Sequence, residues 1–94
     1  MRQATSKVKV EMYSSGGCPY CDRARRLLNK KGVGFTEVRI DKEAGLREEM
    51  ERRSHRQSVP QIFINDHHIG GFDDIAELDF DGELDKLLGL AKDL

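Results

Sequence analysis

A pair of cysteines separated by two residues, Cys18-Pro19-Tyr20-Cys21, constrains this chain more than any other feature of its sequence. A secreted protein of only 94 residues usually needs several disulfides that join distant segments. The chain has two cysteines, and a bond between them closes a very short loop that staples almost nothing. The first six residues lack the apolar segment of a secretory signal. We therefore expect a cytoplasmic protein whose cysteines perform redox chemistry or bind a metal.

Length and composition predict one small domain over residues 1–94, with residues 1–6 as a flexible N-terminal extension. Apolar residues make up 37% of the chain and charged residues 35%, so the core is small and the surface highly charged. No run of 18 apolar residues occurs, which argues against a membrane-spanning helix. The net charge of −1 argues against nucleic-acid binding, since phosphate neutralisation needs a surplus of basic residues. We expect a monomer with no membrane or nucleic-acid partner.

The cysteine pair falls between a predicted strand and a predicted helix. In residues 7–13, charged and apolar side chains alternate, which is typical of a half-buried strand. Pro19 suits the first position of a helix and places Cys18 at the N-cap. Residues 21–31 carry apolar side chains on one face and mostly basic ones on the other, as an amphipathic helix does, and Gly32 ends it.

The rest of the chain predicts three more strands and three more helices. They are expected, in chain order, as a strand over residues 33–40, a helix over 43–53 with Asp41 as its N-cap, strands over 60–64 and 67–69, a helix from its Asp73 cap to about residue 78, and a helix over 82–90. The order β-α-β-α-β-β-α-α implies a parallel crossover followed by an antiparallel hairpin. We therefore predict an α/β fold with one mixed four-stranded sheet flanked by helices.

A cysteine at the start of a helix is chemically activated. The unpaired N–H groups of the first turn and the positive end of the helix dipole stabilise a thiolate on Cys18, which lowers the pKa of this thiol from about 8.5. Cys21 lies one turn further along, close enough to attack a mixed disulfide formed on Cys18. Asp22 opposes this effect locally, whereas three nearby basic side chains favour it: Arg23, Arg25 and Arg26.

A zinc or iron site is a second interpretation of the cysteine pair. Sites with four protein ligands usually add another pair of Cys or His residues. His67 and His68 are neighbours on a predicted strand, so they point to opposite faces and do not complete one site with the cysteines. His55 lies in a polar loop. We expect no bound metal, two hairpin histidines and one solvated histidine.

Three motifs in a fixed order give the chain a family resemblance. They are CPYC over residues 18–21, SVPQIFI over residues 58–64 and GGFDD over residues 70–74. Together they resemble a glutaredoxin of the bacterial dithiol class, and the likeness covers nearly the whole chain. The resemblance implies a thioredoxin-like fold, which agrees with the element order read from periodicity.

The resemblance also implies roles for individual residues. Cys18 would attack and Cys21 would resolve, with glutathione as reductant and no bound cofactor. The backbone of Val59, before a cis-proline at Pro60, would pair with the cysteinyl part of glutathione. The implied glutathione site consists of Tyr20, Arg47, Ser58, Val59, Pro60, Gly71, Phe72 and Asp73.

The two ends of glutathione would meet different parts of this implied site. The amides of Phe72 and Asp73 would receive the γ-glutamyl carboxylate, and the Asp73 carboxylate would pair with the α-amine. One position departs from the family pattern. Many members have a Lys three residues before the first cysteine, where it helps to bind the glycine carboxylate, and this chain has Ser15 there. Arg47 matches another position that members use for the same carboxylate.

The sequence thus predicts a glutathione-dependent thiol–disulfide oxidoreductase that reduces protein–glutathione mixed disulfides and protein disulfides. Its expected partners are glutathione and proteins that carry such disulfides. Two alternatives stay open. A thioredoxin-type protein, reduced by a flavoprotein, usually has a Trp before its cysteine pair, and this chain contains no Trp. A carrier of iron–sulfur clusters would share a cluster between two chains through Cys18 and glutathione, but such members more often have Ser in place of Cys21.

Overall fold

The computed structural model describes residues 8–90, in which strands and helices follow one another in the predicted order. The expected extension over residues 1–6 lies outside the described residues. The elements are β1 (Val10–Ser14), α1 (Pro19–Lys30), β2 (Thr36–Arg39), α2 (Leu46–Ser54), β3 (Gln61–Ile64), β4 (His67–Gly70), α3 (Phe72–Phe80) and α4 (Glu83–Leu87).

The strands form one mixed sheet in the order β2-β1-β3-β4. β1 and β2 are parallel, with Tyr13 opposite Val38, whereas β3 is antiparallel to both β1 and β4. The β3–β4 hairpin turns at Asn65 and Asp66, whose φ angles of 52° and 69° are positive, as a tight hairpin turn requires. The predicted crossover and hairpin are therefore both confirmed.

One face of the sheet is covered by apolar side chains of three helices. Alternation along the central strands sends Val10 and Met12 of β1, and Ile62 and Ile64 of β3, to this face. They pack against α1, α3 and α4 through the buried residues Ala24, Leu28, Ile75, Leu84 and Leu88. We call this side the apolar face, and it holds the larger part of the core.

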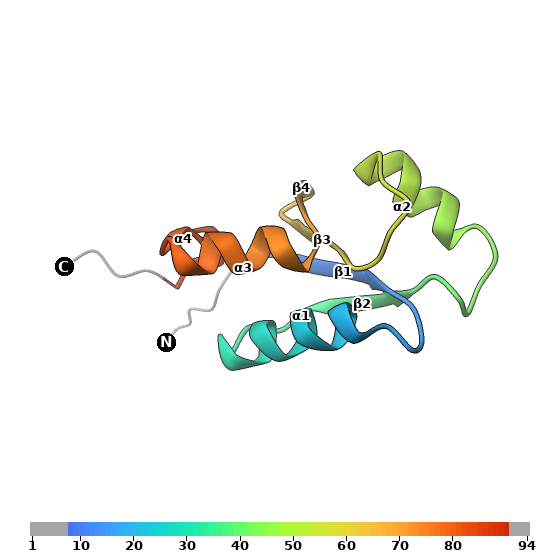
Figure 1. The fold of residues 1–94 in the computed structure, drawn as a ribbon. Helices are drawn as coiled ribbons and strands as arrows, with labels where there is room; N and C mark the ends of the chain where they lie inside the picture. The colour runs from blue at the N-terminus through green and yellow to red at the C-terminus, as the bar shows by residue number, and fades with distance from the viewer. Residues whose placement is uncertain (1–7, 91–94) are drawn as a thin grey trace.

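The opposite face is covered by α2 and is called the α2 face. Figure 1 shows α1 and α2 on opposite sides of the sheet. The buried apolar group here is smaller and consists of Tyr13, Ile40, Met50 and Phe63. The sequence of α2, LREEMERRS, offers only two apolar side chains to the sheet, so much of this interface is polar.

The predicted N-cap of α2 is wrong. The helix begins at Leu46 after Gly45, whose φ of 91° is in the left-handed region. Asp41 instead accepts hydrogen bonds from the Arg39 guanidinium at 2.8 Å and from the Gly16 amide at 3.2 Å. A carboxylate held by these two partners binds the loop before Cys18 to the end of β2.

The predicted N-cap of α3 is also wrong. The helix begins at Phe72, with Gly71 as its N-cap, so Asp73 lies within the first turn. Asp74, at the third helical position, accepts a hydrogen bond from the Gly71 amide at 2.9 Å. A carboxylate that reaches back to the N-cap amide fixes the helix start two residues earlier than an Asp73 cap would.

Among residues 8–90, no helix is both long enough and apolar enough to cross a lipid bilayer.

Candidate active site

Cys18 and Cys21 are joined by a disulfide at the start of α1, with their Cα atoms 5.2 Å apart. Cys18 is the N-cap and Pro19 the first helical residue, as predicted. Cys18 Sγ accepts a hydrogen bond from the Cys21 amide at 3.1 Å. Cys21 is fully buried, whereas Cys18 is partly exposed. An incoming sulfur therefore reaches Cys18 first, and the helix amide is in place to stabilise a thiolate there.

The loop before Cys18 is held by charged residues of the neighbouring strand. The Arg39–Asp41 ion pair lies over Gly16, where a Cβ atom would come within 2.8 Å of the Arg39 guanidinium. The Arg39 guanidinium holds the pKa of Asp41 well below its usual range, and the Gly16 amide adds to this effect. Asp22, which opposes thiolate formation, is paired with Arg25 at 2.6 Å, and the same guanidinium also pairs with Glu37.

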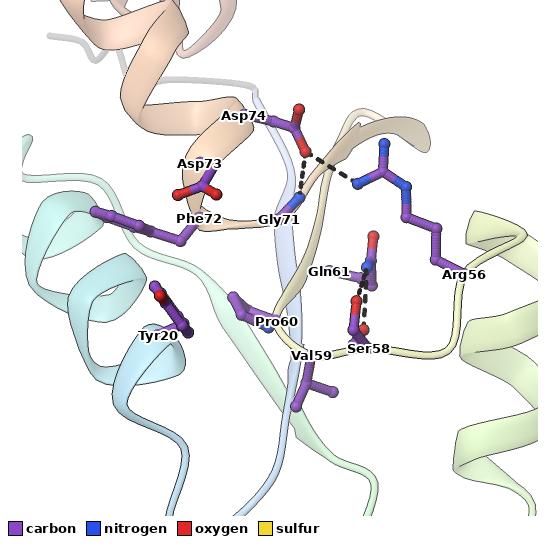
Figure 2. A pocket seen from close by; sticks show the side chains of 10 residues that line it. All are labelled: Tyr20, Arg56, Ser58, Val59, Pro60, Gln61, Gly71, Phe72, Asp73 and Asp74. Carbon is purple, nitrogen blue, oxygen red and sulfur yellow. Dashed lines mark hydrogen bonds and ion pairs between the residues drawn. The ribbon is translucent and has the colours of Figure 1, made fainter.

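A cavity of about 300 Å³ opens at Tyr20, which stands between the two cysteines in the sequence (Figure 2). Its walls come from the start of α1, the segment before β3 and the start of α3. The lining residues are Tyr20, Arg56, Ser58, Val59, Pro60, Gln61, Gly71, Phe72, Asp73 and Asp74.

Seven of the eight residues predicted for glutathione line this cavity, and the eighth, Arg47, does not. Arg47 is exposed on α2, donates a hydrogen bond to the Gln57 carbonyl at 3.0 Å and lies 3.9 Å from Glu51. Ser15 lines a separate polar hollow with Gly16 and Gly17. The role of Arg47 toward the glycine carboxylate therefore stays a prediction.

The segment before β3 faces the reactive sulfur. The Val59-Pro60 peptide bond is cis, as the resemblance implied. The carbonyl oxygen of Val59 lies 3.8 Å from Cys18 Sγ. On the other side of the cavity, the Tyr20 ring is half-exposed, 6.3 Å from the Phe72 ring and beneath the Arg23 guanidinium at 5.1 Å. The cavity thus has a backbone wall next to Cys18 and an aromatic rim.

Asp74 connects two walls of the cavity. Its Oδ2 accepts from the Gly71 amide at 2.9 Å and from Arg56 Nη1 at 3.0 Å (Figure 2). The Gly71 amide, and then the Arg56 guanidinium, lower the pKa of Asp74, so this carboxylate is charged at neutral pH. Gly70, the residue before Gly71, has a φ of 129°, and a Cβ atom at this position would overlap the Asp74 side chain.

Three lining residues were missed by the sequence analysis: Arg56, Gln61 and Asp74. Gln61 and Asp74 stand inside motifs that had been singled out, next to residues that were chosen. Arg56 gave no signal, because Asp74, the carboxylate that pairs with its guanidinium, lies 18 residues further along the chain. The histidines agree with prediction in that His67 is exposed and His68 partly buried on neighbouring positions of β4.

The fold and the site together define a class of protein. A partly exposed cysteine caps a helix that follows the first strand of a mixed sheet, and a buried cysteine lies one turn away. A cis-proline segment faces the pair from the neighbouring strand. This is a thiol–disulfide oxidoreductase of the thioredoxin-like fold.

Comparison with known proteins gives the family. The family profile described as Glutaredoxin matches residues 10–69. Glutaredoxin 3 of Escherichia coli is 57% identical over 79 residues, which is 84% of this chain and 95% of that protein. The solution structure of a glutaredoxin from Brucella melitensis is 44% identical, has a TM-score of 0.80, and the match covers 98% of this chain and 100% of that one.

A third relative was solved with its ligand. The crystal structure of a buckwheat glutaredoxin–glutathione complex has a TM-score of 0.81 and 26% identity, and the match covers 89% of this chain and 79% of that one. The present chain belongs to the glutaredoxin family, as the three motifs predicted. It is a glutathione-dependent thiol–disulfide oxidoreductase with a redox-active dithiol.

Proposed function

We propose that this protein reduces protein–glutathione mixed disulfides and protein disulfides in the cytoplasm, acting as a monomeric domain. The observation that carries this proposal is the position of Cys18. Cys18 is partly exposed, and its sulfur accepts a hydrogen bond from the Cys21 amide. The same sulfur lies 3.8 Å from the carbonyl oxygen of Val59, a residue that lines the cavity. A glutathionyl group bonded to Cys18 could therefore extend into that cavity.

The first reaction begins with the Cys18 thiolate. It attacks the glutathione sulfur of a mixed disulfide, which forms a Cys18–glutathione disulfide and releases the protein thiolate. A second glutathione thiolate then attacks the glutathione sulfur bonded to Cys18, releasing oxidised glutathione and restoring the Cys18 thiolate. A separate NADPH-dependent reductase returns oxidised glutathione to the thiol form, so the protein itself needs no bound cofactor.

A protein disulfide takes a different second step. The substrate becomes bonded to Cys18, and the Cys21 thiolate attacks the Cys18 sulfur, which releases the reduced substrate and forms the Cys18–Cys21 disulfide. The two Cα atoms are already 5.2 Å apart, so this attack is intramolecular and favoured by proximity. Two molecules of glutathione then reduce the internal disulfide.

We propose that the cavity holds the glutathionyl part of the substrate. Its cysteinyl backbone would pair with Val59, and its γ-glutamyl carboxylate would receive the first-turn amides of α3 at Phe72 and Asp73. Those amides have no acceptor within the helix, which supports this assignment. The exposed Asp73 carboxylate would pair with the α-amine, while Asp74 is already occupied by Gly71 and Arg56.

The two cysteines provide the test of the proposed function. Cys18→Ser should abolish both reactions, because it removes the nucleophile. Cys21→Ser should keep reduction of a glutathionylated peptide and lose most reduction of a protein disulfide. Both rates are measured on one preparation, with mass spectrometry of the trapped intermediate. If Cys21→Ser abolishes reduction of the glutathionylated peptide, the route through free glutathione is wrong.

Arg47 and Arg52 form a matched pair for testing the glycine carboxylate. Both are exposed arginines on α2. Arg47→Ala should raise the KM for a glutathionylated peptide several-fold, the effect of losing a charge-assisted hydrogen bond at an exposed site, and Arg52→Ala should leave it unchanged. Equal KM values for the two variants would remove Arg47 from the site.

A further inference from the structure

His68 belongs to a chain of side-chain hydrogen bonds that ends on the cavity wall. His68 Nε2 lies 2.6 Å from Gln61 Oε1, and Gln61 Nε2 donates to the Ser58 carbonyl at 3.0 Å. We propose that His68 is a positioning residue, which acts through Gln61 to hold the Ser58–Val59 segment against Cys18. This inference rests on the proposed binding of the glutathionyl group in the cavity.

The direction of the hydrogen bonds follows from the groups involved. The Ser58 carbonyl can only accept, so it requires the amide nitrogen of Gln61, and the amide oxygen of Gln61 then points at His68. That oxygen can also only accept, so His68 must carry a proton on Nε2. Turning the Gln61 amide around would place its oxygen against the Ser58 carbonyl oxygen, and two acceptors repel each other. The hydrogen bond from His68 Nε2 to Gln61 Oε1 prevents this rotation.

The Gln61 side chain is held by hydrogen bonds at both ends of its amide, to Ser58 through Nε2 and to His68 through Oε1. Its side chain is 1% exposed, so an amide oxygen without a donor would be a buried unsatisfied acceptor. Gln61 also lines the cavity, two residues after Val59. The direction of its amide therefore matters to the wall that faces Cys18.

His68 is itself fixed by its surroundings. It pairs with Phe63 across the β3–β4 hairpin, and the two rings lie 5.1 Å apart. Burial lowers the pKa of His68 most, the Arg56 guanidinium lowers it further, and the Asp74 carboxylate acts in the opposite direction. The lowered pKa favours the neutral imidazole, and the acceptor Gln61 Oε1 places the single proton of that imidazole on Nε2.

The consequence falls on the segment next to the reactive sulfur. Ser58 is exposed, and contact with water alone would not fix the direction of its carbonyl group. The hydrogen bond from the Gln61 amide does fix it. The next carbonyl, that of Val59, lies 3.8 Å from Cys18 Sγ. A substrate that must align with the Val59 backbone benefits from a segment that is already ordered, because less conformational entropy is lost on binding.

His67 supplies a matched control, because it is the neighbouring histidine of the same strand and is exposed. The experiment compares His68→Leu, His68→Gln and His67→Leu with the unmodified protein. It measures kcat and KM for a glutathionylated peptide, and the rate at which iodoacetamide alkylates Cys18. The alkylation rate reports on the thiolate and does not depend on substrate binding.

We expect His68→Leu to raise KM about three- to tenfold, the effect of one lost hydrogen bond, with kcat and the alkylation rate unchanged. His68→Gln should restore KM to within about twofold, since its amide nitrogen can donate to Gln61 in place of Nε2. His67→Leu should behave as the unmodified protein. Gln61→Met, which removes the middle of the chain of hydrogen bonds at similar volume, should reproduce the effect of His68→Leu and provides the test if that variant does not fold.

Two outcomes would overturn the inference, and they differ from failure of the proposed function. Equal KM values for His68→Leu, Gln61→Met and the unmodified protein would show that the chain of hydrogen bonds positions nothing. A raised KM that His68→Gln does not restore would assign the effect to packing on Phe63 instead. Absence of glutathione-dependent turnover in the unmodified protein would overturn the proposed function itself.

Discussion

The two faces of the sheet carry different kinds of side chain. On the apolar face, β1 and β3 send aliphatic and Met side chains into a group of nine buried residues from β1, β3, α1, α3 and α4. On the α2 face, the same two strands present Glu11, Tyr13, Gln61 and Phe63, and a single charged helix covers them. Polar side chains there are partly buried and hydrogen-bonded to one another, as Arg53 shows by donating to Tyr13 at 2.8 Å and to Glu11 at 3.0 Å.

This difference separates two tasks that a small domain must perform. Apolar contacts are non-directional, so the apolar face contributes stability without fixing particular orientations. Hydrogen bonds are directional and costly when broken, so the α2 face fixes orientations at the expense of desolvating polar groups. The Ser58–Val59 segment and the cavity wall are attached to the second kind of face.

The largest effect on stability is expected on the apolar face. Leu28→Ala removes a side chain that is fully buried between α1 and the sheet, and should lower the free energy of unfolding by about 2–5 kcal/mol. Urea unfolding measures this change. Leu87→Ala, in which the side chain is already 40% exposed, is the control and should cost clearly less. Similar costs for the two variants would mean that the apolar face is not the main source of stability.

An intermediate effect is expected from the α2 face. Arg53→Met removes a guanidinium that lies 4.0 Å above the Phe63 ring and leaves Glu11 without its 3.0 Å ion pair. The cost should be about 1–3 kcal/mol, much of it from the half-buried carboxylate that loses its partner. Adding Glu11→Gln should therefore recover part of the loss. If the double variant is no more stable than Arg53→Met, the unpaired charge is not the cause.

The smallest effect concerns pH. Because the pKa of His68 is lowered in the folded protein, the unfolded chain takes up a proton first as the pH falls below about 6.5. The stability that neutral His68 contributes is complete above that value and is lost as the pH falls through the lowered pKa. His68→Gln lacks this loss. The free energy of unfolding of the unmodified protein minus that of His68→Gln should thus fall from pH 7.5 to pH 5, as measured by urea unfolding, and a rise in this value would contradict the direction of the shift.

The sequence predicted the apolar face better than the α2 face, and the reason is physical. Periodicity reports which side chains are apolar, so strands such as residues 60–64 and the helix after Cys18 were placed correctly. The N-cap of a helix depends on which carboxylate accepts a hydrogen bond from which backbone amide in the folded chain. Asp41 was assigned to a helix but binds Arg39 and Gly16 instead.

The candidate site shows the same division. Residues within motifs, such as Val59 and Phe72, were assigned to the cavity and do line it. Arg56 was missed because its ion pair with Asp74 joins segments that only the folded chain brings together. The hydrogen bond between His68 and Gln61 was missed for a related reason, because it crosses the β3–β4 hairpin. The pairing register of these two strands cannot be deduced from their amino-acid composition.

The overlap between Gly70 and Asp74 bears on attempts to change the substrate range of this enzyme by directed evolution. A side chain at position 70 would meet a strained backbone and would push the Asp74 carboxylate away from both Gly71 and Arg56. Position 56 is different, because its side chain is 48% exposed at the edge of the cavity. A library randomised at position 56 would sample new cavity shapes, whereas one randomised at position 70 would mostly sample damaged helix starts.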